Sequence, residues 1–181
     1  FNKHSHFNLA NIVTFFNISC GIFAIYFLTH DEFMGAALFA WLAGAFDIFD
    51  GKIARKYNLS TEFGIQLDSY ADFLSFVIVP AMFIYFAIFD GKESFYNMAL
   101  IAFVFIYYVI SGLRRLIQFN INANEGEVEK YFTGIPTPLG AILLWVVYLI
   151  YLTDYVNEYF VLGSIIIIGY LLNSKIKIKH L

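Results

Sequence analysis

The chain has 181 residues, of which 60% are hydrophobic, 20% aromatic and 14% charged, whereas charged residues make up about 25% of an ordinary soluble domain. With a mean hydropathy of +0.70, this composition excludes a water-soluble globule, a disordered tail and a collagen. The single cysteine, Cys20, excludes a disulfide scaffold, and the net charge of −3 argues against nucleic-acid binding as the main task. We therefore predict an all-α integral membrane protein with one domain over residues 1–181.

The intervals between charged residues predict the spans, because a transmembrane helix needs about 20 mostly apolar residues. Six intervals meet or approach this length: 9–28, 33–46 with a helix that continues to about Arg55, 73–89, 95–113, 131–153 and 159–174. The sequence therefore predicts six transmembrane helices, with both termini on the same side. Residues 1–7 carry basic and aromatic side chains and are candidates for a short interfacial helix before the first span.

The distribution of basic residues predicts the orientation, since Lys and Arg accumulate in cytoplasmic loops. Ten of the eleven basic residues fall on one side of the six-helix arrangement, and only Lys92 falls on the other. We therefore expect cytoplasmic termini in the cell membrane, with the segment 47–72 near the cytoplasmic face.

Four of the fourteen acidic residues lie within 26 positions, as Asp47, Asp50, Asp68 and Asp72. The i, i+3 and i, i+4 spacings direct two carboxylates from each of two consecutive helices. Such groups repel one another unless a positive charge lies between them. Oxygen ligands in this number suit Mg²⁺, Mn²⁺ or Ca²⁺ and suffice for two ions. The alternative, that each aspartate caps a helix end at the water boundary, does not require the paired spacing.

Small residues accompany the aspartates. Gly51, Ala54 and Gly64 leave room for a flat or phosphate-bearing molecule to approach the backbone. Arg55 suits bidentate contact with phosphate oxygens. This part of the chain is therefore a candidate phosphate-binding site.

Together these positions fit D-x2-D-G-x2-A-R-x8-G-x3-D-x3-D, a pattern that resembles the signature of the CDP-alcohol phosphotransferase family. The resemblance implies a six-helix membrane enzyme, usually a homodimer, that transfers the phosphatidyl group from a CDP-linked lipid to an alcohol and releases CMP. It implies that the four aspartates hold two divalent metals, Mg²⁺ or Mn²⁺ with Ca²⁺ as an alternative bound ion. It also implies that Asp72 is the general base.

A second region concerns the alcohol. Residues 111–120 read SGLRRLIQFN and residues 131–140 read YFTGIPTPLG, which resemble the R-L-A-R-F-N and F-x-G-L-P-x-P segments of the phosphatidylserine synthase branch. The resemblance implies that CDP-diacylglycerol, or its ether-lipid analogue, and L-serine are the substrates. Arg114 or Arg115 would bind the serine carboxylate, and Gln118 or Asn120 would orient it. Gln118 departs from the branch, which usually has arginine there. Alternatively, both arginines are membrane-boundary anchors.

The first predicted helix carries Asn11, Thr14 and Asn17 at helical spacing, followed by Gly21. Such polar stripes usually join transmembrane helices by hydrogen bonds. The family resemblance adds that Asn11 and Thr14 are candidate cytidine contacts.

Three alternatives to a serine-dependent enzyme stay open. The same catalytic residues would serve an enzyme whose acceptor is glycerol 3-phosphate or inositol 1-phosphate. A divalent-cation transporter would use the aspartates as an ion path, but this leaves Gly51, Ala54, Arg55 and Gly64 unexplained. A prenyl-transfer enzyme would bind metals similarly but would not need a cytidine site.

Overall fold

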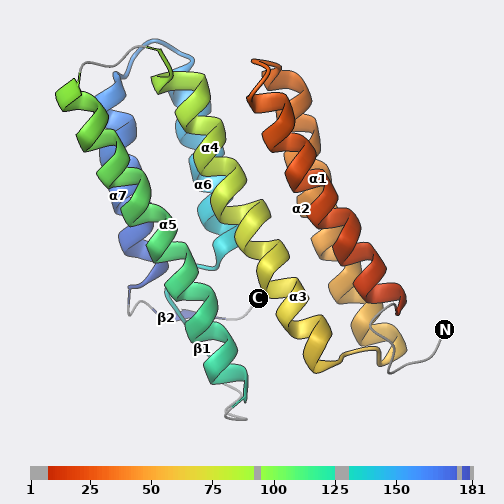
Figure 1. The fold of residues 1–181 in the computed structure, drawn as a ribbon. Helices are drawn as coiled ribbons and strands as arrows, with labels where there is room; N and C mark the ends of the chain where they lie inside the picture. The colour runs from red at the N-terminus through yellow and green to blue at the C-terminus, as the bar shows by residue number, and fades with distance from the viewer. Residues whose placement is uncertain (1–7, 92–94, 125–130, 175–176, 180–181) are drawn as a thin grey trace. The chain divides into compact units, whose positions relative to one another are not determined.

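The computed structural model describes residues 8–91, 95–124, 131–174 and 177–179, which form helices and one short β-ladder (Figure 1). Four helical segments are long and apolar enough to cross a membrane: Leu9–Leu28, Phe33–Tyr57, Glu62–Phe89 and Met98–Ile121. Two further apolar helices have 15 residues each, or about 22 Å, against a hydrocarbon core of about 30 Å. The fold fits an α-helical membrane protein, and the count of six spans stays a prediction.

The chain divides into two compact units, Phe1–Phe83 and Ile84–Leu181, which are described separately below. The boundary falls inside the continuous helical segment Glu62–Phe89. The assignment of residues 1–181 to one domain stays a prediction.

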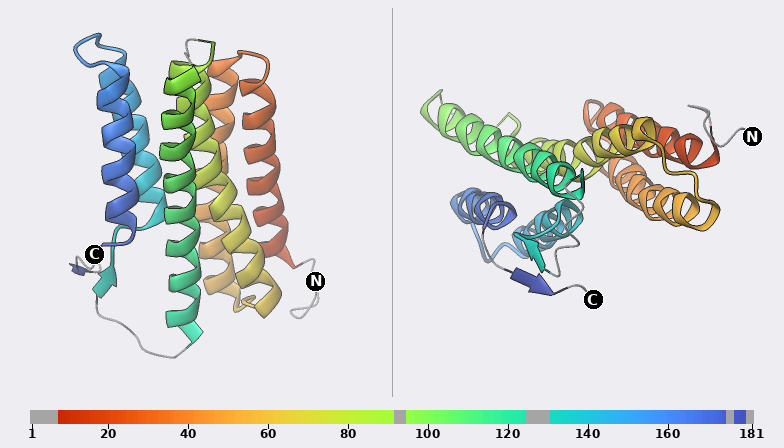
Figure 2. Two further views of the ribbon diagram at one scale, coloured as in Figure 1. Left: turned by 60° about the vertical axis from the view of Figure 1, so that its left-hand side comes forward. Right: turned by 90° about the horizontal axis from the view of Figure 1, so that it is seen from below.

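In the first unit, α1 (Leu9–Leu28) and α2 (Phe33–Tyr57) form an antiparallel helix pair, drawn red and orange in Figures 1 and 2. The Asn8 side chain caps α1 by accepting a hydrogen bond from the Asn11 backbone N–H. Phe27 stacks against Phe39 with 5.4 Å between ring centroids. The predicted limits of α1 are confirmed, and α2 ends two residues beyond the predicted Arg55.

The third helical segment is longer than its charge-free interval. It begins at α3 (Glu62–Asp72), capped by the Thr61 hydroxyl, and continues through the π-helical η1 (Phe73–Ile78), α4 (Val79–Ile84) and the π-helical η2 (Tyr85–Phe89). Pro80 cannot donate a backbone hydrogen bond, and π-type turns are one way in which transmembrane helices accommodate such a residue. The charge-free interval 73–89 therefore covers only the later part of this segment, and Asp68 and Asp72 lie on a helix, as their spacing predicts.

The second unit contains α5 (Phe95–Asn124), α6 (Thr137–Tyr151) and α7 (Glu158–Leu172), with α6 and α7 side by side in both views of Figure 2. The strands β1 (Tyr131–Thr133) and β2 (Lys177–Lys179) pair antiparallel. α5 runs past the predicted end at residue 113, α6 ends two residues before residue 153, and α7 spans 158–172 instead of 159–174.

The charge-free interval 131–153 begins before its helix does. Residues 131–133 form β1, Gly134 has a φ of +80°, and α6 begins only after Pro136. Proline is tolerated before or within the first helical turn but not deeper in a helix. A backbone hydrogen bond of 3.1 Å from the Ile135 N–H to the Leu171 carbonyl holds this turn against the end of α7.

The interfacial helix expected at residues 1–7 lies outside the described residues. So do residues 125–130 and 175–176, which include some of the basic residues used for the orientation.

Candidate active site

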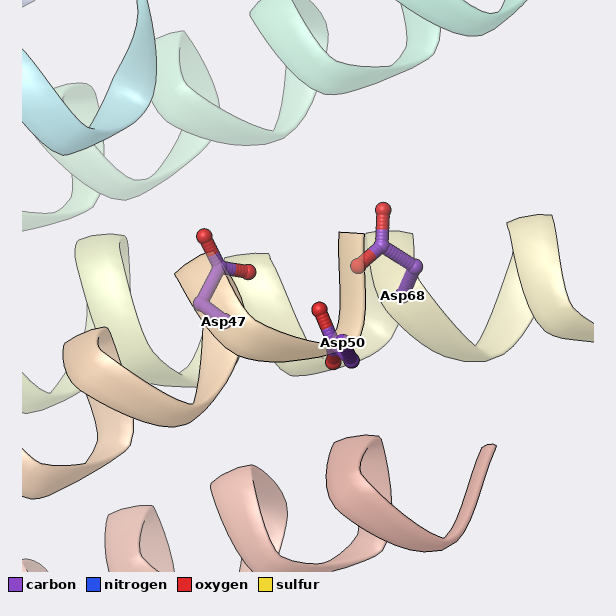
Figure 3. Close-up of side chains that lie close together, drawn as sticks. All are labelled: Asp47, Asp50 and Asp68. Carbon is purple, nitrogen blue, oxygen red and sulfur yellow. The ribbon is translucent and has the colours of Figure 1, made fainter. Parts of the chain in front are cut away.

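Three of the four predicted aspartates converge. Asp47 and Asp50 from α2 and Asp68 from α3 each place one carboxylate oxygen within 4.8 Å of the others (Figure 3). Asp50 is 3% exposed, Asp47 is half-buried and Asp68 is exposed. Asp47 and Asp50 therefore lie on one face of α2, as their spacing predicts, and Asp68 meets them from the next helix; their role as metal ligands stays a prediction.

Asp72 lies next to this group without being one of its three members. Its carboxyl is adjacent to that of Asp47, and its Oδ1 atom is buried with no hydrogen-bond partner in the described part of the chain. Asp72 is the last residue of α3, directly before the π-helical turn of η1.

The donor set fits a divalent cation. Both carboxylate oxygens of Asp50 are buried without a hydrogen-bond partner among the described residues, and buried carboxylates are costly unless they are paired or bind a metal. Oxygen ligands around Mg²⁺ or Ca²⁺ lie about 2.0–2.6 Å from the ion, so three oxygens within 4.8 Å of one another are close enough to share one. Asp47, Asp50 and Asp68 are thus a candidate metal centre.

A cavity of about 200 Å³ opens beside the aspartates in the first unit. It is lined by two of the aspartates, Asp50 and Asp68, and by all six residues that the sequence marked for the CDP-lipid: Asn11, Thr14, Gly51, Ala54, Arg55 and Gly64. These six residues come from α1, α2 and α3. The structure therefore brings the whole predicted set to one cavity.

Four lining residues were missed: Ala10, Leu59, Ser60 and Ile65. Leu59 and Ser60 lie between α2 and α3, inside the eight positions that the signature leaves undefined. For Leu59 and Ser60, the sequence offers one indication of a place at the cavity, which is that they lie a few positions before Gly64.

Local hydrogen bonds fix the connection between α2 and α3. Asn58 ends α2 in the left-handed conformation, with a φ of 51°, which Asn tolerates better than most residues. The Asn8 side chain donates to the Leu59 carbonyl over 3.1 Å. The Thr61 hydroxyl accepts from the Gly64 N–H over 3.0 Å. The cavity wall is therefore tied to the start of α1.

The two glycines of the signature have different surroundings. A Cβ on Gly64 would lie 2.8 Å from Asn11 Oδ1 and 3.2 Å from Thr61 Oγ1, whereas a Cβ on Gly51 would meet only the Arg55 guanidinium at 3.9 Å. Gly64 therefore allows close packing of α3 against α1, and Gly51 leaves space within the cavity.

The predicted acceptor residues lie on α5 in the second unit. Arg115 is 7% exposed; its Nε donates to the Ile135 carbonyl over 3.2 Å, and its guanidinium lies 5.7 Å from the Phe119 ring centroid. Arg114 and Gln118 are exposed and Asn120 is half-buried. Arg115 thus connects α5 with the turn before α6, a contact that the sequence did not reveal.

Comparison with known proteins identifies the family. Residues 7–172 match the profile of the CDP-alcohol phosphatidyltransferase family. Because this match covers most of the chain, the protein belongs to that family of membrane transferases, as the aspartate signature indicated.

Three similar proteins are named as CDP-diacylglycerol–serine O-phosphatidyltransferases or as an archaetidylserine synthase. The chain is 31% identical to the CDP-diacylglycerol–serine O-phosphatidyltransferase of Bacillus subtilis, over 93% of this chain and 88% of that protein. It is 33% identical to the enzyme of the same name from Methanocaldococcus jannaschii, over 93% and 72% of the two chains. It is 30% identical to the archaetidylserine synthase of Methanothermobacter thermautotrophicus, over 93% and 68%.

The glycine geometry predicts opposite outcomes for two alanine variants. Gly64→Ala is expected to lower the free energy of unfolding by about 1–3 kcal/mol, because its Cβ would overlap Asn11. Gly51→Ala is expected to leave stability near wild type but to weaken the thermal shift that CDP-diacylglycerol produces. Thermal unfolding in detergent, with and without the lipid, measures both. Equal destabilisation by the two substitutions would contradict the distinction.

Proposed function

We propose that the protein transfers the phosphatidyl group of a CDP-diacylglycerol-type lipid to the hydroxyl of L-serine and releases CMP. The observation that carries this proposal is the cavity beside the aspartates, which gathers all six residues marked for the CDP-lipid. The names of the similar enzymes support serine as the acceptor.

The cavity suits the nucleotide and phosphate part of the donor. Asn11 and Thr14 offer polar groups for the cytosine and ribose, and Gly51 and Ala54 allow close approach to the backbone. Arg55 would bind phosphate oxygens through its planar guanidinium. In the proposed complex, the acyl chains remain in the lipid phase.

The reaction is a displacement at the phosphorus that carries the diacylglycerol. The serine hydroxyl oxygen forms a bond to this phosphorus. The bond between this phosphorus and the oxygen that bridges it to CMP breaks. The serine hydroxyl proton passes to the Asp72 carboxylate, the proposed general base. The bridging oxygen and its electron pair leave with CMP.

Asp47, Asp50, Asp68 and Asp72 would hold two divalent cations, Mg²⁺ or Mn²⁺. When bound, these ions would neutralise charge on the attacked phosphoryl group and on the departing CMP. Binding of the second ion would require Asp72 as a ligand in addition to the three converging carboxylates.

Residues of α5 are proposed to select the acceptor. A buried guanidinium such as that of Arg115 is a favourable partner for the serine carboxylate. Arg114, Gln118 and Asn120 are the other candidates. Glycerol 3-phosphate or inositol 1-phosphate is the alternative acceptor class, since adjacent arginines also suit a phosphate group.

Three expectations complete the proposal. The two shorter helices complete six spans, both termini and the active site lie on the cytoplasmic side, and the protein forms a homodimer. The distribution of basic residues supports the orientation, and the family resemblance supports the dimer.

The assay that tests the function measures CMP release by the purified protein in detergent with Mn²⁺ or Mg²⁺. CDP-diacylglycerol or its diether analogue is the donor, and serine, glycerol 3-phosphate or inositol 1-phosphate is added one at a time. We expect release that depends on serine and is abolished by EDTA. Stimulation only by a phosphorylated alcohol would contradict the serine assignment, and no release with any acceptor would contradict the transferase proposal.

The two aspartate positions predict separable defects. Asp72→Asn is expected to reduce turnover roughly 10²- to 10⁴-fold, the range for loss of a general base, while retaining metal and CDP-lipid binding better than Asp50→Asn does. Asp50→Asn is expected to lose turnover and binding together, because Asp50 belongs to the converging group and lines the cavity. CMP release and the Mn²⁺-induced thermal shift separate the two. Normal turnover by Asp72→Asn would exclude it as the base.

Arg115 and Arg114 provide a matched pair on α5. Arg115→Ala is expected to raise the apparent KM for serine roughly 10- to 100-fold, since hydrogen bonds to charged groups contribute about 1.5–3 kcal/mol. The KM for the CDP-lipid should change little. Arg114→Ala, which removes an exposed charge one residue away, tests the other candidate arginine, and a larger rise in the KM for serine there would assign the carboxylate to Arg114. A selective loss of CDP-lipid affinity in Arg115→Ala would remove Arg115 from the acceptor site.

A further inference from the structure

A buried polar contact joins α1 to the π-helical turn that follows Asp72. The Ser75 hydroxyl donates a hydrogen bond of 2.5 Å to Asn17 Oδ1. Asn17 is 0% exposed and Ser75 is 3% exposed. Neither residue lines the cavity, so the contact acts on the site only through the helices that carry it.

The packing around this contact is tight. A Cβ on Gly21, one helical turn beyond Asn17, would lie 2.9 Å from Leu74 Cδ2 and 3.6 Å from Ser75 Oγ. The polar contact and the close approach therefore fix two successive residues of η1 against one face of α1. That face continues from Asn11 and Thr14, which line the cavity.

The position of this anchor along the helix matters for Asp72. A π-turn closes its hydrogen bond one residue later than an α-turn, so residues beyond it are rotated relative to a continued α-helix. The change occurs directly after Asp72, and Ser75 is the third residue of η1. The contact with Asn17 therefore holds the widened turn that begins directly after Asp72.

The contact is poorly explained by stability alone. The Asn17 Nδ2 group is buried and has no hydrogen-bond partner in the described part of the chain. Replacing both partners of a buried hydrogen bond by apolar groups of similar shape is often neutral or stabilising, whereas an unpartnered donor is costly. By this comparison, stability alone does not require a polar pair at this position.

We infer that Asn17 and Ser75 are positioning residues that hold the Asp72 carboxylate in its reactive orientation through the π-helical turn. This inference rests on the proposed function, because it assigns to Asp72 the proton transfer of the reaction. Neither residue lines the cavity; the contact links the α1 face that lines the cavity to the π-helical turn directly after the base.

The test compares Asn17→Leu, Ser75→Ala and the double variant with wild type. We expect kcat for serine-dependent CMP release to fall roughly 10- to 100-fold in all three, since small misplacements of reacting groups are costly. The double variant should be no slower than the single ones, because the residues act as one unit. The KM for CDP-diacylglycerol and the Mn²⁺-induced thermal shift should stay near wild type. Ser19→Ala, which removes a hydroxyl bonded to the Phe15 carbonyl of the same helix, is the control with unchanged rate.

Thermal stability distinguishes a positioning role of the contact between Asn17 and Ser75 from a purely structural role. The inference predicts that the double variant is at least as stable as the single variants and still slow. Recovery of kcat together with stability in the double variant would overturn it, as would loss of the Mn²⁺ shift. If the double variant does not fold, the kcat of Ser75→Ala, which deletes one oxygen atom, tests the inference. A kcat equal to that of the wild type would overturn it. If the wild type releases CMP with serine and the variants are as fast, this inference alone is overturned. If the wild type releases no CMP with serine, the proposed function is overturned and the inference with it.

Discussion

Repulsion among carboxylates that are held close together within a helix bundle is the interaction on which the organisation of the first unit depends. Two unit charges 4.8 Å apart repel by about 3–4 kcal/mol at an effective dielectric constant of 20. The fold must therefore oppose this repulsion until a cation or a proton offsets it. Asp50 shows the cost most clearly, because both of its oxygens are buried without a partner among the described residues. The surrounding helix contacts have to supply the missing stability.

Those contacts converge on α1. Asn8 holds the connection between α2 and α3, Asn11 packs against Gly64, and Asn17 and Gly21 contact the turn after Asp72. Each contact spans at least fifty positions in sequence, so none is a local consequence of helix formation. The polar stripe on α1 was predicted from helical spacing, and the role of Asn11 and Thr14 as cytidine contacts stays a prediction. Its first part faces the cavity, and its later part joins helices.

Helix limits were predictable where charge and capping agree. Asn8 caps α1 at its first apolar residue, and the charge-free interval coincides with the helix. The charge-free intervals are shorter than the helices where a helix carries charged residues within its length, as α5 does with Arg114 and the third segment with Asp68. A charge marks a preferred depth in a membrane and does not end a helix. The fifth charge-free interval begins before its helix for another reason. Pro136 prevents the helix from extending back to residue 131.

The residues of the candidate site were predictable because their spacing encodes a helix phase. Asp47 and Asp50 share a face at three residues apart, and the same regularity brought Gly51 and Arg55 to one cavity. Spacing could not distinguish Gly51 from Gly64, since their roles depend on whether Asn11 of another helix lies opposite. Beyond Asp72 the phase itself changes, because η1 replaces the α-helical hydrogen-bond pattern by a wider one. Helical spacing therefore predicts the positions of residues up to Asp72 and not those of η1, where Ser75 contacts Asn17.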